Sequence, residues 1–181
     1  MTSPEIYALR ELRMEDAPQV FRAFGSDPLM QRQGSVSTLT EAQQYTEDLV
    51  QSPLQAAHAI TANDELVGLV CASIDTANAN GWFWYWMDAS QRGHGVCSRG
   101  AATLANHLLT TGGLHRLELG ARANNPASLK VARAAGFIPE GVERDKFLMD
   151  GVRVDVMTFS RLVHDPIPQI DPLPFVATAR T

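Results

Sequence analysis

The stretch from Ser90 to Ser98, SQRGHGVCS, limits the possible folds more than any other part of the chain. It joins an apolar, aromatic segment at 81–88 to a segment at 96–111 whose apolar residues recur at helical spacing. Glycines let the backbone turn tightly and approach a ligand, and the free amides at a helix N-terminus attract anions. The stretch therefore predicts a strand, a turn and a helix, in which the turn either binds a phosphate group or is only a tight turn.

Two nucleotide-binding motifs are incomplete in this stretch. Gly93 and Gly95 begin the G-x-G-x-x-G pattern of dinucleotide-binding folds, but Ser98 stands where the third glycine is needed. The stretch also follows a fourth or fifth predicted strand, whereas that pattern opens its fold. A P-loop is excluded because no Gly-Lys-Ser/Thr is present. A nucleotide-dependent enzyme is therefore kept only as a third hypothesis beside the two developed below.

Strand and helix patterns follow one another through the rest of the chain up to residue 163. Segments of period two predict strands, segments of helical period predict helices, and Gly, Asn, Asp and Pro mark the turns between them. We expect strands at 6–12, 56–61, 65–74, 81–88, 114–121, 138–147 and 152–162, and helices at 18–25, 38–49, 96–111 and 125–135. This order predicts an α/β or α+β domain with a mixed sheet.

The starts of the first two predicted helices are marked by local sequence patterns. Pro18 suits the first turn of a helix in which the aromatic residue Phe21 is expected to share the buried face. Thr38 and Glu41 have the spacing of a capping box, which satisfies two of the free amides at the start of the second helix.

The composition of the chain changes clearly only in its C-terminal tail. Pro166, Pro168, Pro172 and Pro174 lie close together there, and proline excludes a helix or a central strand. We therefore expect one domain at 1–163 and a Pro-rich extension at 164–181. The extension is either disordered or an extended arm that packs on the domain or on a partner.

Charge and cysteine content exclude several classes of protein. The 181 residues carry a formal net charge of −5, which argues against bulk nucleic-acid binding and suits either a cationic substrate or simple solubility. The two cysteines and five histidines show no ligand spacing, so no metal is expected. The N-terminus lacks the build of a signal peptide, and no apolar run approaches the ~20 residues that span a bilayer. We expect a cytoplasmic protein that does not bind a membrane.

A second motif lies at 124–137. Asn125 is a preferred N-cap, and Pro126 is preferred at the first position of the helix that follows. Ser128 shares a helical face with the apolar residues three, four and seven positions after it, so it should point inward. A hydroxyl on an apolar face needs a hydrogen-bond partner, which favours a function for Ser128 over a simple place in a helix start.

Taken together, these motifs resemble the GNAT superfamily of acetyltransferases, and within it the RimJ/RimL branch. The phosphate-binding motif of the family is Arg/Gln-x-x-Gly-x-Gly/Ala at the start of the helix after the fourth strand. Arg92 and Gly95 match this motif, and Cys97 stands at its final small position. The stretch 114–137 and the closing hairpin around Gly151 resemble the RimJ/RimL branch, and the whole resemblance covers roughly residues 7 to 162.

The resemblance implies a fold and a cosubstrate. The GNAT fold is a mixed, mostly antiparallel seven-stranded sheet flanked by about four helices, with a V-shaped splay between its fourth and fifth strands. Acetyl-CoA is expected in the V, with its pantetheine arm against the backbone of Trp86 and Met87 and against Asn125, and with its thiol near Ser128. The residues expected to bind the pyrophosphate are Arg92, Gly93, His94, Gly95, Val96, Cys97 and Ser98.

The implied reaction is direct attack of an amine on the acyl thioester, without an acyl-enzyme. Ser128, which the resemblance places near the thiol, is expected to protonate the leaving thiolate. Ala132 occupies the position of the tyrosine acid of many family members, so no tyrosine can act from there. The glutamate base of some RimJ/RimL-type enzymes aligns with Phe147, so the base stays unassigned. The candidate bases are Glu118, Glu143 and Asp145, and Glu118 is the preferred candidate.

The acceptor is expected to be a primary amine, on a protein N-terminus, an amino acid or a small molecule. An α-amino group, with a pKa of about 8, loses its proton at pH 7 for ~1.4 kcal/mol, whereas a lysine amine needs roughly 4.6 kcal/mol. The loop at 31–37 and the helix after it are expected to form one wall of the acceptor site. The aromatic residues at 82–86 are assigned mainly to packing, with the alternative that one or two of them line the acceptor groove. The alternative is a non-catalytic CoA-binding module, and we expect a monomer or homodimer in either case.

Overall fold

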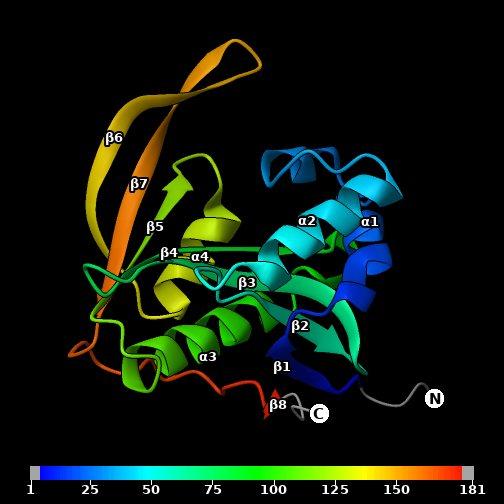
Figure 1. Ribbon diagram of the computed structural model, residues 1–181. Coiled ribbons are helices and arrows are strands. Elements are labelled where there is room, and N and C mark those ends of the chain that lie inside the picture. The colour runs from blue at the N-terminus through cyan, green and yellow to red at the C-terminus, as the bar shows by residue number, and fades with distance from the viewer. Residues whose placement is uncertain (1–4, 177–181) are drawn as a thin grey trace.

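An open sheet of eight strands organises the computed structural model, which describes residues 5–176 (Figure 1). Across the sheet the order is β6-β7-β5-β4-β3-β2-β1-β8. The strands are β1 (Tyr7–Glu11), β2 (His58–Ala62), β3 (Glu65–Asp75), β4 (Asn80–Met87), β5 (Arg116–Arg122), β6 (Ile138–Met149), β7 (Val152–Leu162) and β8 (Phe175–Val176). The helices are α1 (Ala17–Gly25), α2 (Leu39–Gln51), α3 (Val96–Thr110) and α4 (Pro126–Ala134), with 3-10 turns η1 (Met14–Asp16), η2 (Pro28–Arg32) and η3 (Ala89–Gln91). The predicted α+β class and its four helices are confirmed.

The expected count of seven strands is wrong by one, because the tail adds the edge strand β8 parallel to β1. Proline has no N–H to donate but keeps a carbonyl acceptor, and the Leu9 N–H donates to the Pro174 carbonyl at 2.9 Å. Leu173 is 2% exposed, and its N–H donates to Thr103 Oγ1 at 2.9 Å. The described part of the tail is therefore an arm packed on the domain, while 177–181 lie outside the described residues.

Short-range sequence patterns account for the ends of several elements. Thr38 Oγ1 accepts from the Glu41 N–H at 3.2 Å, and the Glu41 carboxylate accepts from the Thr38 N–H at 3.0 Å, so the capping box is present. Asn63 and Asp64, at φ +51° and +70°, form the turn between β2 and β3, as a type I′ turn requires. The expectation that Phe21 faces the core is wrong, because it is 40% exposed on the outer side of α1.

The sheet is covered on both faces. Helices α1 and α2 cover one face over a core that includes Leu69 and Trp86, and α3 covers the other over a core that includes Phe83 and Leu117 (Figure 1). Side chains alternate along a strand, so β4 contributes to both cores. Among residues 5–176, no helix is long and apolar enough to cross a membrane.

Strands β4 and β5 form a parallel pair at one end only, where residues 80–82 pair with residues 116–118. Beyond this point no pairing joins the two strands in the described chain. On its other side, β4 stays paired with β3 as far as Met87, and β5 stays paired with β7 as far as Arg122. Both strands that border the opening are therefore held in place by the rest of the sheet. The predicted splay between the fourth and fifth strands is confirmed, and it leaves backbone groups of β4 without a strand to pair with.

Candidate functional site

A cleft of about 390 Å³ lies at the opening between β4 and β5. Its walls come from η2, the second half of β4, the turn before α3, the end of β5 and the start of α4. The predicted residues that line it are Trp86, Met87, Arg92, Gly93, Gly95, Val96, Cys97, Ser98, Asn125 and Ser128. His94 and Glu118 do not line it, because His94 is exposed in the turn and Glu118 lies on the paired part of β5. The fold thus brings the two sequence motifs together in one cleft.

The turn before α3 leaves backbone amides free for a ligand. Gly93 and Gly95 have φ of +88° and +75°, a region that other residues rarely adopt, and a Cβ at either position would meet nothing within 4 Å. Glycine is therefore required by the backbone conformation rather than by a lack of space. Gly95 is the N-cap of α3, and no side chain of the described residues caps this helix. The first-turn N–H groups, together with the helix dipole, suit an anion.

Arg92 connects this turn to η2. Its guanidinium forms an ion pair with Asp27, and its Nε donates to the Met87 carbonyl at 3.2 Å. Asp27 also caps η2 by accepting from the Leu29 N–H at 2.8 Å, and this bond, followed by that from Arg92, lowers the pKa of the Asp27 carboxyl. The Arg92 side chain is still 41% exposed, so its charge adds to the positive potential at the turn.

The partner that Ser128 requires is Tyr85. Asn125 caps α4 by accepting from the Ser128 N–H at 3.1 Å, which fixes the serine at the start of the helix. The Tyr85 hydroxyl donates to the Ser128 carbonyl at 2.9 Å and lies 3.1 Å from Ser128 Oγ. Burial raises the pKa of Tyr85, so its hydroxyl stays protonated at neutral pH. The aromatic residues of this strand were assigned mainly to packing from the sequence, and Tyr85 was not singled out. The signal that could have found it is its hydroxyl, because a buried tyrosine hydroxyl needs a hydrogen-bond partner.

A comparison with protein families shows which family the chain belongs to. The model of the acetyltransferase (GNAT) domain matches residues 7–138, which include the turn before α3 and the start of α4. The chain belongs to the GNAT acetyltransferase family. The resemblance predicted from Arg92, Gly95 and Ser128 is therefore confirmed at the level of the family.

Individual GNAT proteins are similar to this chain in sequence and in structure. The ribosomal-protein-serine acetyltransferase of Escherichia coli K12 is 31% identical over 105 residues, which are 58% of this chain and 59% of that enzyme, less than two thirds of its length. RimL, a ribosomal L7/L12 α-N-protein acetyltransferase in complex with coenzyme A, has a TM-score of 0.79 at 22% identity, over 87% of this chain and 94% of that chain. The microcin C7 self-immunity acetyltransferase MccE, in complex with acetyl-CoA and AMP, has a TM-score of 0.76 at 19% identity, over 87% of this chain and 92% of that chain. The predicted likeness to RimJ/RimL-type enzymes is supported.

Neither cysteine of this GNAT chain is suited to act as a nucleophile. Cys97 lies in the first turn of α3 and lines the cleft, but burial raises its pKa to about 12, against the opposite effect of Arg92. Burial also raises the pKa of Cys71 to about 12. Since the thiolate is the nucleophilic form, the raised pKa of each thiol disfavours nucleophilic attack by it at neutral pH.

The candidate bases lie away from the lining of the cleft in the GNAT fold. Glu118 accepts from Arg116 Nε at 2.6 Å, and Arg116 also pairs with Glu140 on β6. Glu143 is paired with Lys146 on the exposed β6. Asp145 is exposed beside it, at φ +54°. The structure brings none of the three carboxylates into the lining of the cleft, and a base role for Glu118 stays a prediction.

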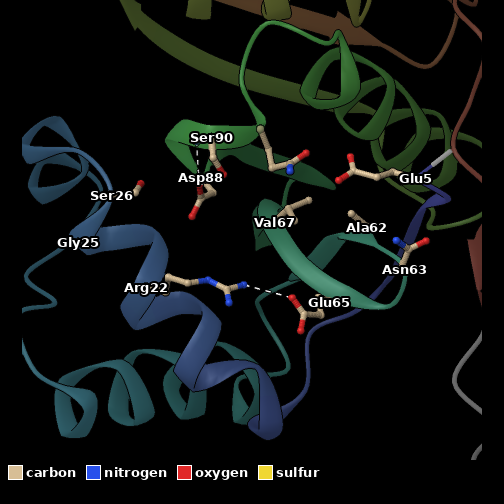
Figure 2. A pocket seen from close by; sticks show the side chains of 11 residues that line it. Glu5, Arg22, Gly25, Ser26, Ala62, Asn63, Glu65, Val67, Asp88 and Ser90 are labelled. Atoms are coloured by element: carbon tan, nitrogen blue, oxygen red, sulfur yellow. Dashed lines mark hydrogen bonds and ion pairs between the residues drawn. The ribbon is translucent and has the colours of Figure 1, made fainter. Parts of the chain in front are cut away.

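A larger hollow of about 790 Å³ lies outside the splay, between α1, the β2–β3 turn and η3 (Figure 2). Arg22 faces Glu65 across it at 3.4 Å, and the Asp88 carboxylate accepts from the Ser90 hydroxyl at 2.6 Å, so these charged groups already have partners (Figure 2). None of the residues predicted to bind acetyl-CoA lines this hollow. We therefore place the candidate site in the smaller cleft between β4 and β5.

Proposed function

We propose that this GNAT protein transfers an acetyl or other short acyl group from acyl-CoA to a primary amine within a ternary complex. The observation that carries the proposal is the Tyr85–Ser128 hydroxyl pair, which lies in the splay beside the uncapped N-terminus of α3. Acetyl-CoA as the cosubstrate is supported by RimL and MccE, whose structures hold coenzyme A and acetyl-CoA.

The groups along the cleft fit the parts of acyl-CoA in order. The pyrophosphate suits the free amides between Gly93 and Ser98. The pantetheine arm, which carries amide groups, suits the edge of β4 that faces the opening beside Trp86 and Met87 and has no pairing with β5 there. Asn125 also lines the cleft and can bind the same arm. The thioester then lies near Ser128, at the start of α4.

The chain's own groups can support both halves of the reaction. The amine nitrogen forms a bond to the thioester carbonyl carbon, and N–H groups of β4 that face the opening stabilise the oxyanion that develops. The carbon–sulfur bond then breaks, and the Ser128 hydroxyl gives its proton to the leaving thiolate. The nitrogen, now part of an amide, loses its surplus proton to water. Tyr85 is protonated in the resting enzyme because of its raised pKa, and its hydroxyl lies 3.1 Å from Ser128 Oγ. It can relay a proton to the serine and take one back from water, so that both hydroxyls are restored.

An acceptor with an α-amino group needs no strong carboxylate base. Its pKa is about 8, so roughly a tenth of it is unprotonated at pH 7. We therefore expect a variant with Glu118→Gln, Glu143→Gln and Asp145→Asn to keep kcat/KM for an α-amine within about threefold of the unmodified chain. Steady-state rates at pH 7 and 8 check this. A loss of more than about a hundredfold would show that one of the three is the base.

Acetyl-CoA is expected to raise the unfolding temperature of the protein. At 100 times its Kd, a ligand that binds only the native state stabilises it by about 2.7 kcal/mol, which corresponds to roughly 5–11 °C for a domain of this size. ATP and NAD, which the incomplete nucleotide motifs do not support, should cause no such shift. Differential scanning fluorimetry measures all three, and an absent shift with saturating acetyl-CoA would contradict the proposed site.

Turnover separates the enzyme from a non-catalytic CoA-binding module. The enzyme is expected to release free coenzyme A from acetyl-CoA only when an amine is present, which a thiol reagent detects. A protein that binds acetyl-CoA but shows no release across α-amino acids, N-terminal peptides and polyamines would instead be the binding module.

A further inference from the structure

The two faces of the opening between β4 and β5 carry different groups. Tyr85 and Ser128 lie on the face that α3 and α4 cover, together with the free amides of α3. Trp86 alternates to the opposite face, where it packs under α1 and α2. An acyl-CoA bound on the α3–α4 side leaves the opposite face as the approach for the amine.

Two arginines flank the opening on the face of α1 and α2. Arg122 ends β5 and shares a face with Gly120, at which an added Cβ would lie 3.4 Å from the Trp82 ring. Arg32 ends η2, in the loop that the sequence analysis assigned to the acceptor wall. Both arginines line the cleft.

The lining of the cleft carries charge of one sign. Its charged residues in the described chain are Arg32, Arg92, Arg122 and Lys130, with no Asp or Glu among them, although the whole chain has a net charge of −5. The phosphates of acyl-CoA can account for Arg92 at the turn and for Lys130 on α4. Arg32 and Arg122, on the other side of the sheet, are left without a role in binding the cosubstrate.

Neither of these two arginines has a strong anionic partner. Arg122 donates from Nη1 to the Met149 thioether at 2.9 Å, a weak acceptor, and no carboxylate of the described residues pairs with it. Burial, followed by the charge of Arg32, lowers the pKa of Arg122. Arg32 meets Asp150 of the β6–β7 turn at 3.6 Å, but that carboxylate is 92% exposed, so the pair is weak and can exchange for a ligand.

We propose that Arg32 and Arg122 bind a carboxylate carried by the acceptor, a few bonds from its amine; this rests on the proposed function. Two neighbouring guanidinium groups in a partly buried cleft repel each other, and an anion between them removes the repulsion and takes charge-assisted hydrogen bonds from both. The Asp150 carboxylate on Arg32 is the same chemical group as the proposed ligand. The acceptor is then either a free α-amino acid or a peptide with an acidic residue at or next to its N-terminus.

Two matched pairs of acceptors test the proposal and show whether the carboxylate belongs to a free amino acid or to a peptide. The first pair is an α-amino acid and its carboxamide, and the second is a C-terminally amidated peptide that begins Ser-Asp and its Ser-Asn counterpart. We expect kcat/KM to be about 10- to 100-fold higher for the acid of at least one pair, mostly through KM. In Arg122→Gln and Arg32→Gln the ratio of kcat/KM for the acid to kcat/KM for its neutral partner should fall to about one. Preference in the first pair identifies a free amino acid, and preference in the second identifies a peptide.

Arg22→Gln is the control, because Arg22 lies on α1 in an exposed pair with Glu65, outside the cleft. It should keep the acid preference of the unmodified chain. The Kd of acetyl-CoA, from calorimetry, should stay within about threefold in Arg122→Gln and Arg32→Gln, because a larger loss would place these arginines on a phosphate of acyl-CoA instead. Equal losses for acid and neutral acceptors, or no acid preference in the unmodified chain, would also overturn the proposal.

A direct binding measurement keeps this inference apart from the proposed function. Calorimetry on the protein saturated with coenzyme A measures whether the acid of each pair binds more tightly than its neutral partner, and whether Arg122→Gln removes the difference. Preferential binding without turnover would support the carboxylate site while the transferase proposal fails. Turnover without preferential binding would leave the transferase and overturn the carboxylate site.

Discussion

Replacing Ser128 with alanine is expected to lower kcat about 10- to 100-fold while the Kd of acetyl-CoA changes little. The reason is that Ser128 Oγ is the group that we assign to protonation of the leaving thiolate, and a thiolate with a pKa near that of free cysteine leaves without help at a lower rate. Single-turnover rates, with acetyl-CoA binding measured separately, check this. Ser128→Thr keeps the hydroxyl and should recover most of the rate.

The same prediction includes Tyr85, which we assign to positioning Ser128 and restoring its proton. Tyr85→Phe removes the hydroxyl that lies 3.1 Å from Ser128 Oγ, so we expect kcat to fall while KM for the amine stays unchanged. In the Ser128→Ala background, the second substitution should cost almost nothing further. Two full, multiplicative losses would show that the hydroxyls act independently and would contradict the positioning role.

Tyr45→Phe is the matched control for this pair. Its hydroxyl is also buried and hydrogen-bonded, because it accepts from Trp86 Nε1 at 3.1 Å, but it lies on α2 and does not line the cleft. Both tyrosine variants should lower the free energy of unfolding by a similar amount, about 1–3 kcal/mol, because each leaves a buried hydrogen-bond partner unpaired. Only Tyr85→Phe should lower kcat.

Gly95→Ala is expected to weaken acetyl-CoA binding about tenfold or more. Gly95 is the N-cap of α3 and has a φ of +75°. A residue with a Cβ pays about 1–2 kcal/mol in this left-handed region. The backbone can relieve this strain only by changing its conformation, which turns the amides away from the phosphate position. Calorimetry with acetyl-CoA measures the loss.

Gly113 offers a closely matched control for this substitution. It has the same φ of +75°, also with nothing within 4 Å of an added Cβ, but it follows the C-terminal end of α3. Gly113→Ala should therefore lower the unfolding temperature about as much as Gly95→Ala and leave acetyl-CoA binding intact. Equal binding in both variants would remove the turn from the proposed pyrophosphate site.

The elements of this fold could be predicted because their signals are local. The Thr38–Glu41 capping box and the glycines at 93 and 95 act on backbone within a few residues, and the structure has each of them in the expected conformation. The strands predicted at 56–61 and 65–74 are likewise joined by a tight turn at Asn63 and Asp64. The same holds for the capping of α4 by Asn125. The order of the two motifs along the chain was then enough to indicate the family.

The partners of the side chains in the cleft depended on contacts between distant parts of the chain. Alternation along β4 shows that Tyr85 and Trp86 face opposite sides, but it cannot show that Ser128, 43 residues away, supplies the partner of the tyrosine. The ion pair of Arg92 with Asp27 spans 65 residues in the same way.

By itself, the sequence determined the order of elements, the glycine turn before α3 and the family, because propensities, caps and turns need only neighbouring residues. Only the tertiary structure decided which groups meet: the Tyr85–Ser128 pair, the edge strand of the tail, and a cleft lined by cations in an acidic chain. The net charge is a sum over the whole sequence, whereas the potential in a cleft depends on which few charges the fold brings together. Here η2, the end of β5 and the start of α4, remote from one another in sequence, supply the cations that converge on the cleft.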